Sequence, residues 1–485
     1  MTGNNVVIDN GQYSIKFGST SQENPYVVPN CIIRTQDKRI HLGETLSTAK
    51  SIADLALTSG GLSNITFQRP IRSGQCYQWN LEHQIWDSAF VSSRVDSGNG
   101  DFLNNANLLY IESPITLSKF QNMTDQILFE EYNIGGLVRS SGPALAPWLD
   151  AFDDDNTSAS QVTIKEITHN KIVKTEESKE GNSSYKNFQL VIDSGFDCTW
   201  VVPVIYGIPY YRAIRKLPIA GKFLNGYLRE VVSFRHYNIS EEPILVNAIK
   251  HQTCYIATDF NETLNKLTML KKYPSQLIDS DLSLSYILPN NKTDFLGYSV
   301  ADKTKLSKTD LRNIQKTLEK KSYRDNGNES DFDDDINNSY DNNGSNSAQS
   351  LLLTDERFMI PELLFRPQLS GVHKAGLIQT IKSSLEAVPE LLQPLLVNNI
   401  VCSGGTSNIK GFSERILKDL NSEVPVEAQT KIRDFSHITK DRSLLSWYAG
   451  KSFFDKGGFG KVKMTRQEYY EFGAEYSQEK FGFKL

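Results

Sequence analysis

Three short segments of the sequence combine glycine with an acid or a hydroxyl group. They are Asp9-Asn10-Gly11, Asp193-Ser194-Gly195 and Ser403-Gly404-Gly405-Thr406. Glycine lets the backbone approach a ligand and supplies free N–H groups, which suit phosphate oxygens, as do a neighbouring hydroxyl or the Lys16 ammonium. Asp9 and Asp193 are suited to hold Mg²⁺ through water, because Mg²⁺ takes few carboxylates and keeps its hydration. The segments together predict a phosphate site with Mg²⁺.

Each segment taken alone has a simpler explanation, because Asp-polar-Gly sequences are common in β-hairpin turns. The first two segments each stand between two apolar, β-branched runs, which predicts two hairpins whose turns carry the acid and the glycine. The two copies lie about 180 residues apart, which indicates an internal duplication. Three such turns in duplicated order favour a ligand site over three unrelated turns.

Hydrophobic periodicity predicts the elements that position these turns. Strands are expected over 6–8, 13–18, 26–28, 108–111, 189–192, 199–204 and 400–402, and helices over 77–90, 123–132, 221–232, 244–256, 376–385, 412–420 and 465–471. In the helix over 123–132, we expect the apolar residues 127–129 to face the core and Asp125, Glu130 and Glu131 to face solvent. Mixed strands and helices predict an α/β protein.

Composition limits the class of protein. The chain has 485 residues, of which 39% are hydrophobic and 22% charged, as in soluble globular proteins of two to four domains. A formal net charge of −5 argues against broad, charge-driven binding of nucleic acid. We expect no membrane association, because no apolar run approaches ~18 residues. The five cysteines lie mostly in apolar runs, which favours buried thiols in the cytosol or nucleus: Cys31, Cys76, Cys198, Cys254 and Cys402.

The set of turns resembles the actin superfamily, and the similarity runs almost from end to end. The first segment, with Lys16 and Gly18, resembles actin's first phosphate loop, the second segment its second loop, and the third its adenosine-side glycine turn. Similar stretches occur at 127–133, 254–257, 357–362 and 466–469. The resemblance implies a duplicated, two-lobed α/β actin-like fold with a central nucleotide cleft. It also implies that ATP with Mg²⁺ binds there, with Lys250 on the nucleoside side.

The resemblance implies a division of the chain into two lobes with insertions. The expected parts are a first lobe at 1–149 with a small peripheral subdomain at about 34–67, an insertion or extended loop at 150–187, a second lobe at 188–299, a largely disordered insertion at 300–350, and the remainder of the second lobe returning to the first at 351–485. Residues 323–350 are mostly Asn, Asp, Ser and Gly, a composition with little to bury.

Within the superfamily, the chain is most similar to the sixth class of actin-related proteins. The similarity rests on residues 28–31, 128–132, 221–224, 228–235 and 361–365. Members of that class are nuclear subunits of Swr-type chromatin remodellers, which exchange a core histone for its Z-type variant. The resemblance implies a scaffold in the nucleus, with some in the cytoplasm. It also implies that a zinc-finger HIT subunit, the remodeller ATPase and other remodeller subunits are the partners. Contact with nucleosomes or histones stays open, and we do not expect a homopolymer.

Departures from actin indicate that ATP is not efficiently hydrolysed, so we assign no catalytic residue. Gly142 stands where actin carries the glutamine that positions the attacking water, and glycine has no side chain for this task. Phe196 replaces an acid, Trp200 a histidine near the γ-phosphate, His251 a glutamate, and Ser443 a lysine. The alternative is an actin-like ATPase, or a sugar-kinase-like one, that uses hydrolysis for conformational or assembly control.

Other features leave two interpretations open. The basic cluster Arg212, Arg215, Lys216 and Lys222 either contacts DNA phosphates or an acidic partner, or is a solvated surface. Residues 303–321 are either a nuclear import signal or an exposed helix, and the Asp/Asn tract at 323–350 either binds histones or is a spacer. The histidines have no zinc-ligand spacing with any cysteine, so we expect no zinc site.

Overall fold

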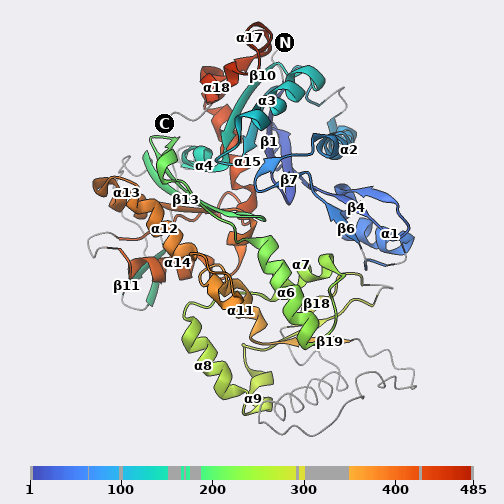
Figure 1. Cartoon of the computed structure of the whole chain (residues 1–485), viewed down its shortest axis with the longest axis vertical. Helices are drawn as coiled ribbons and strands as arrows, with labels where there is room; N and C mark the ends of the chain where they lie inside the picture. Colours follow the sequence, from blue (N-terminus) through green and yellow to red (C-terminus); the bar gives the residue numbers. More distant parts are fainter. Residues whose placement is uncertain are drawn as a thin grey trace. The chain divides into compact units, whose positions relative to one another are not determined.

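The structure of this chain is a computed structural model (Figure 1). It describes residues 4–59, 61–63, 65–97, 102–150, 165–168, 171–174, 187–290, 294–300, 349–424 and 429–481. Backbone contacts divide the chain into two compact units. Unit 1 comprises Met1–Ile52, Ile65–Leu224 and Leu363–Leu485, and unit 2 comprises Ala53–Asn64 and Asn225–Glu362. The domain boundaries expected from the sequence stay a prediction. The sequences at 303–321 and 323–348 lie outside the described residues.

Unit 1 contains two large sheets, of which the first has six strands in the order β21-β10-β9-β1-β2-β3. Its strands are β1 (Asn5–Asn10), β2 (Ser14–Ser19), β3 (Tyr26–Pro29), β9 (Asn107–Glu112), β10 (Gly136–Ser141) and β21 (Met464–Thr465). β1 pairs antiparallel with β2 and parallel with β9, and β9 pairs parallel with β10. In β1, Val6 and Ile8 pack in one hydrophobic cluster and Val7 in another. Both faces of the sheet are therefore covered, as the apolar run predicts.

The second sheet repeats this arrangement. It has the order β15-β14-β13-β20, with β16 also pairing with β14. Its strands are β13 (Phe188–Ser194), β14 (Thr199–Ile205), β15 (Ile208–Pro209), β16 (Arg215–Leu217) and β20 (Ile400–Ser403). β13 pairs antiparallel with β14 and parallel with β20, just as β1 pairs with β2 and β9. The predicted α/β class and the duplication are both confirmed.

The expected position of the two acids needs a correction. Asp9 and Asp193 do not lie in the hairpin turns but in paired strand residues one position before the end of each ladder, opposite Lys16 and Trp200 respectively. Ser194 is also still in β13 and pairs with Thr199. The ladder continues past each acid because the residue that follows it still pairs, Asn10 with Ile15 and Ser194 with Thr199. A paired strand holds these carboxylates more firmly than a turn would.

Helices cover both sheets of unit 1. They are α2 (Trp79–Ser97), α3 (Ser118–Gln126), the π-helical turn η2 (Ile127–Glu131), α4 (Gly142–Leu145), η3 (Ala146–Asp150), η5 (Tyr211–Ala213), η7 (Pro367–Ser370), α12 (Leu377–Glu386), η8 (Glu390–Leu392), α13 (Gln393–Val397), η9 (Gly405–Asn408), α14 (Phe412–Asn421), η10 (Arg442–Leu444), α15 (Leu445–Asp455), α16 (Gly458–Val462), α17 (Arg466–Phe472) and α18 (Tyr476–Phe481). Figure 1 shows α17 and α18 beside α3 and β10. Most predicted helices are thus found with shifted ends.

One hydrophobic cluster joins the two sheets of unit 1. It contains Val7 and Leu109 from the first sheet, Val191 and Val401 from the second, and Trp447 from α15. Helix α15 approaches the first sheet closely at Gly450, where an added Cβ would lie 2.9 Å from side-chain atoms of Val7 and Leu109. Glycine is required there because no side chain fits between helix and sheet.

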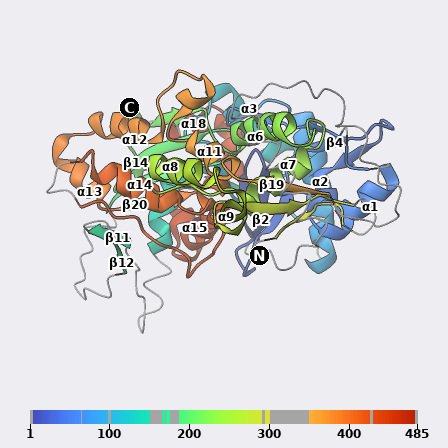
Figure 2. The same cartoon turned by 90° about the horizontal axis from the view of Figure 1, so that it is seen from below.

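Smaller elements of unit 1 lie around the two sheets. They are β4 (Ile32–Arg34), β5 (Ile40–Leu42), η1 (Gly43–Leu46), β6 (Thr66–Gln68), β7 (Ile71–Arg72), β8 (Gln75–Cys76), β11 (Lys165–Thr168) and β12 (Lys171–Lys174). The order β5-β4-β6 forms a three-stranded sheet where a small peripheral subdomain was expected. β11 and β12 form an antiparallel hairpin within the expected insertion, and Figure 2 shows it near α14. Residues 165–168 and 171–174 are therefore paired strands within the segment expected as an insertion or extended loop.

Unit 2 is built from helices around a three-stranded antiparallel sheet. It contains α7 (Pro243–Thr253), α8 (Phe260–Leu270), α9 (Pro274–Asp279), β17 (Leu284–Ile287), β18 (Tyr298–Val300), β19 (Ser350–Leu353) and α11 (Glu356–Glu362), with parts of α1 (Ala49–Ser59) and α6 (Gly221–Arg235). The carboxylate of Glu356 lies 3.0 Å from His236 Nε2, and Asp355 Oδ2 lies 2.7 Å from Arg235 Nη1. These pairs tie the end of α6 to the start of α11.

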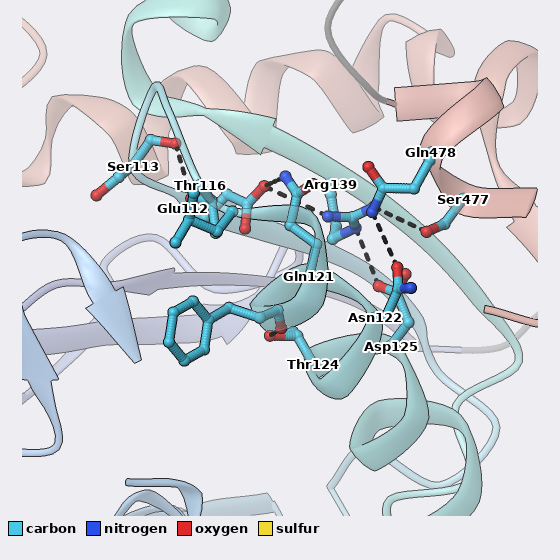
Figure 3. Close-up of polar contacts among 12 residues, drawn as sticks. Glu112, Ser113, Thr116, Gln121, Asn122, Thr124, Asp125, Arg139, Ser477 and Gln478 are labelled. Carbon is cyan, nitrogen blue, oxygen red and sulfur yellow. Dashed lines mark hydrogen bonds and ion pairs between the residues drawn. The ribbon is translucent and has the colours of Figure 1, made fainter. Parts of the chain in front are cut away.

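A buried ionic network attaches the C-terminal helix α18 to the first sheet (Figure 3). Arg139 on β10 lies 2.9 Å from Asp125 Oδ1 and 3.5 Å from Glu112 Oε1, and it donates to Ser477 Oγ on α18. Asp125 is fully buried, so the expectation that it faces solvent is wrong. Helix α3 continues into the π-helical turn η2, and tertiary packing places Asp125 against Arg139. Burial is the main cause that raises the pKa of Asp125 to about 7, although Arg139 lowers it.

We predict that Arg139→Met destabilises the protein by about 3–5 kcal/mol, because it leaves two buried carboxylates without their cation. A raised carboxylate pKa makes stability fall as the pH rises through about 7, and loss of Arg139 raises that pKa further. The deficit should therefore be larger at about pH 8 than at about pH 5.5, as measured by urea unfolding. Lys382→Met is the control, because its partner Glu423 is exposed. An equal deficit at both pH values would contradict the assignment.

Candidate functional site

The first two predicted segments lie at the ends of matching strands in unit 1. Lys16 Nζ on β2 donates a 3.0 Å hydrogen bond to Asp9 Oδ2 on β1, and both side chains are largely buried. The pairing follows from the hairpin register, in which the two residues are opposite each other. Asp9 and Lys16 therefore form a charge-assisted hydrogen bond that fixes both side chains beside the first loop.

Asp193 occupies the corresponding place on the second sheet. Ser403 Oγ donates to Asp193 Oδ1 at 3.2 Å, and Ser403 pairs with Asp193 in the parallel ladder of β13 and β20. Burial is the main cause that raises the pKa of Asp193 to about 6, and repulsion by Asp9 raises it further, while Lys16 opposes the rise. The two carboxylates therefore lie close enough to repel each other, which is the arrangement expected of a cation site.

The third segment touches the second one. Gly404 has φ of +86°, and an added Cβ there would lie 2.3 Å from Ser194 O and 2.7 Å from Asp193 Oδ1. Thr406 Oγ1 donates to Gly195 O at 2.6 Å. Gly404 is therefore required both by its backbone conformation and by the close approach of β13. The structure brings Asp9, Lys16, Asp193, Gly404 and Thr406 together in unit 1.

Three of the glycine N–H groups that were expected to be free are bonded within the chain. Gly11 N donates to Asp9 O at 3.1 Å, Gly195 N to Cys198 O at 3.2 Å, and Gly404 N to Arg442 O at 3.2 Å. The N–H groups of Gly11 and Gly195 bond to carbonyl oxygens of their own hairpins, and that of Gly404 bonds to Arg442 in η10. A phosphate at these glycines would have to replace internal hydrogen bonds.

A buried polar group beneath the first loop was not identified from the sequence. Glu82 on α2 is fully buried, and its Oε1 accepts hydrogen bonds from Asn30 Nδ2 at 3.1 Å and Trp86 Nε1 at 3.0 Å. Asn30 Nδ2 is also 3.1 Å from Gly11 O, and Asn10 Nδ2 donates to Tyr110 OH at 3.0 Å. Burial raises the pKa of Glu82 to about 7. Glu82 and Asn30 are 52 positions apart in the sequence, so no local spacing indicated the contact.

Three of the residues that depart from actin lie, like the site, in unit 1. An added Cβ at Gly142, the first residue of α4, would lie 2.5 Å from Ser446 Oγ. Ser443 lies beside Gly405, where an added Cβ would be 3.8 Å from the serine Cβ. Trp200 is buried, with Lys216 Nζ 5.0 Å from its ring centroid. The position of Gly142 is therefore filled by a neighbouring side chain.

Two predicted residues on the nucleoside side lie in unit 2, on α7. Lys250 is buried there, and burial lowers its pKa to about 8. His251 is exposed. They are not among the residues that unit 1 brings together, so their part in a ligand site stays a prediction.

The basic cluster has intramolecular partners in the structure. Arg215 Nε donates to Ser383 Oγ at 3.1 Å, Lys216 Nζ donates to Ser73 O at 2.9 Å, and Lys222 Nζ lies 3.8 Å from Asp197 Oδ1. All three cations therefore hold neighbouring segments in place. Contact of this surface with DNA or an acidic partner stays a prediction.

The remaining chemistry of the described residues is limited. All five cysteines are free and buried, as the apolar runs predicted. Among the residues that the structure describes, no three His, Cys, Asp or Glu side chains are grouped to bind a metal ion directly. Asp9 and Asp193 as a pair therefore suit a hydrated cation only. Within the described part of the chain, no helix is long and apolar enough to cross a lipid bilayer.

We predict that Asp193→Asn stabilises the ligand-free protein at about pH 8 by about 3 kcal/mol. A carboxylate whose pKa is raised to about 6 costs stability when ionised, so this cost appears as the pH rises from about 4 through 6. The gain should vanish near pH 4, as measured by thermal unfolding across this pH range. Glu242→Gln is the control, because burial also raises the pKa of Glu242, which lies in unit 2. A less stable Asn variant at pH 8 would contradict the prediction.

Comparison with known proteins agrees with this geometry. The sequence matches the family model described as "Actin" over residues 2–482. It is 34% identical over 486 residues to "Actin-like protein ARP6" of Kluyveromyces lactis, which covers 99% of this chain and 98% of that protein. The protein of the same name in Candida glabrata is 33% identical over 480 residues, with the same coverage. "Actin-related protein 6" of Neurospora crassa is 28% identical over 488 residues, or 99% of this chain and 94% of that protein.

These matches confirm the predicted actin fold, and proteins with this fold generally bind a nucleotide with Mg²⁺. The paired acids, Lys16 and the glycine turn fit such a group, although the internally bonded glycine N–H groups are an added cost. The matches span nearly the whole chain, so the similarity is not confined to one segment. The chain belongs to the actin family, and within it to the actin-related proteins of the sixth class.

Proposed function

We propose that this protein is a non-catalytic, actin-like scaffold subunit of a nuclear, ATP-dependent chromatin remodelling complex. In this proposal the complex exchanges a core histone for its Z-type variant, and the scaffold binds a zinc-finger HIT subunit and the remodeller ATPase. The observation that carries the loss of catalysis is the contact at Gly142, where Ser446 Oγ occupies the place of a Cβ.

The geometry at Gly142 argues against hydrolysis in two ways. Glycine offers no group that orients an attacking water, which is a large part of catalysis of phosphoryl transfer. The neighbouring serine also fills the space where a side chain would begin, at 2.5 Å from the ideal Cβ. A simple reversion to glutamine would therefore clash, so Gly142 and Ser446 act as a matched pair.

The same site supports ATP binding with Mg²⁺. Asp9 and Asp193 are the two carboxylates that repel each other, and a hydrated cation between them would relieve that repulsion. Lys16 is held beside Asp9. Because Gly404 has no side chain, the glycine turn packs directly against Ser194 and Asp193. Bound nucleotide would stabilise the protein by linkage without being consumed.

The proposed partners and compartment follow from the class. The relatives bear names of the sixth class of actin-related proteins and match along nearly the whole chain. We therefore propose residence in the nucleus, with some in the cytoplasm, and assembly with other remodeller subunits rather than with copies of itself. Contact with nucleosomes or histones is not part of this proposal.

A second candidate function is an actin-like ATPase that uses hydrolysis for conformational or assembly control. The retained Asp9–Lys16 pair and the carboxylate of Asp193 favour it, because these groups are suited to a metal–triphosphate. The scaffold is preferred because Gly142 and Phe196 both lack the polar groups that hydrolysis requires.

We predict that the purified chain hydrolyses bound ATP at least tenfold more slowly than actin measured beside it, in single-turnover reactions. The double variant Gly142→Gln/Ser446→Gly should raise the rate, because it supplies the amide and the space for it. Ser446→Gly alone is the control and should change nothing. A wild-type rate equal to that of actin would support the ATPase instead.

We also predict that the tagged chain, purified from nuclear extract, recovers a Swr-type remodeller ATPase together with a zinc-finger HIT protein. The Gly142→Gln/Ser446→Gly variant should recover the same partners, because a scaffold does not need turnover. Mass spectrometry identifies and quantifies the recovered proteins. Recovery of cytoskeletal proteins without any remodeller ATPase would overturn the proposed role.

A further inference from the structure

The tips of the two phosphate loops touch each other through aromatic rings. Tyr13 lies in the first loop (residues 11–13, between β1 and β2), and Phe196 lies in the second (residues 195–198, between β13 and β14). Their ring centroids are 5.0 Å apart, with 50° between the ring planes. Tyr13 remains 38% exposed, so this contact joins two surface loops rather than completing a core.

Arg69 lies against both rings. Its guanidinium carbon is 5.0 Å from the centroid of Tyr13 and 5.0 Å from that of Phe196. Its Nη1 also donates hydrogen bonds to the carbonyl oxygens of Gln12, Tyr13 and Asn30, each at 3.0 Å. A planar guanidinium satisfies backbone acceptors at its edge while its face stacks on aromatic rings. Arg69 therefore fixes the shape of the first loop and links it to the second.

A third connection comes from the hairpin of β7 and β8. Its tip is Ser73-Gly74, and both residues have positive φ, +54° and +79°. Ser73 N donates to Asp197 Oδ2 in the second loop at 2.7 Å, and Ser73 O accepts from Lys216 Nζ on β16 at 2.9 Å. The N–H and C=O groups of Ser73 are therefore both hydrogen-bonded, one to the second loop and the other to β16 of the second sheet. Hydrogen bonds to charged groups such as these are stronger than neutral ones.

We propose that Tyr13, Arg69, Ser73, Phe196 and Asp197 form a cross-loop latch that fixes the spacing of the two phosphate loops in the absence of a ligand. Three of its contacts reach the second loop from other segments: Tyr13 and Arg69 contact the ring of Phe196, and Ser73 N donates to Asp197. The latch residues are positioning residues for the proposed nucleotide site. The latch forms within the isolated chain and requires neither a partner nor bound ATP.

The latch has a consequence that a core contact does not have. Its rings are partly exposed at loop tips, so truncating one removes little buried area and should leave global stability nearly unchanged. The loss should instead appear as local opening of the opposite loop, because the two loops hold each other. The latch therefore predicts that a substitution in one loop increases amide hydrogen exchange in the other.

The test is amide hydrogen exchange on the full chain, freed of nucleotide with apyrase and EDTA. Phe196→Ala should increase exchange at least tenfold in peptides covering 11–16 and 70–76, although the substitution lies in the second loop. Tyr13→Ala should do the same for 195–200. Phe196→Tyr keeps the ring and should restore wild-type exchange. Tyr206→Ala is the control, because Tyr206 is an exposed aromatic that packs on Phe188 at the other end of β14.

The double variant Tyr13→Ala/Phe196→Ala decides whether the two residues act together. If the latch is one device, the double variant should exchange no faster than either single variant, because the first truncation already opens it. Additive increases, or unchanged exchange at 11–16 in Phe196→Ala, would overturn the proposal. If an Ala variant fails to fold by circular dichroism, Phe196→Leu and Tyr13→Leu replace them, with the same expected outcomes.

Discussion

The packing of α15 between the two sheets of unit 1 is the constraint on which the rest of that unit depends. The helix approaches the first sheet at Gly450, and its Trp447 belongs to the hydrophobic cluster that also contains Val191 and Val401 of the second sheet. Because this core holds the two sheets together, the ends of β1 and β13 are brought near each other. The paired carboxylates of Asp9 and Asp193 are a consequence of that apolar packing.

The site is costly to the ligand-free protein. Burial and mutual repulsion raise the pKa of Asp193, and burial raises the pKa of Glu82 beneath the first loop. Buried carboxylates of this kind destabilise a protein without a ligand. They are therefore typical of sites that hold a ligand or a cation. The latch residues and the internal hydrogen bonds of the glycine turns offset part of this cost. The latch residues and the internal hydrogen bonds of the glycine turns are both consistent with a scaffold that keeps its shape without a ligand.

At Gly142, the absence of a side chain is matched by the packing of a neighbouring helix. Ser446 on α15 occupies the volume that a side chain at position 142 would need, so the helix that joins the sheets also closes this place. A side chain at position 142 would therefore require Ser446 to move. It also relates the proposed loss of hydrolysis to the same helix that positions the two acids.

The sequence by itself determined the local features of this protein: the two strand–Asp–Gly hairpins, the glycine turn after β20, most helices, the buried cysteines and the resemblance to actin. These were predictable because hydrophobic period and turn chemistry act between near neighbours. Only the tertiary structure decided that Asp125 is buried against Arg139, that Glu82 lies beneath the first loop, and that Tyr13, Arg69 and Phe196 meet. Those contacts join residues far apart in the sequence, and no local pattern specifies which distant polar or aromatic side chains a shared core will bring together.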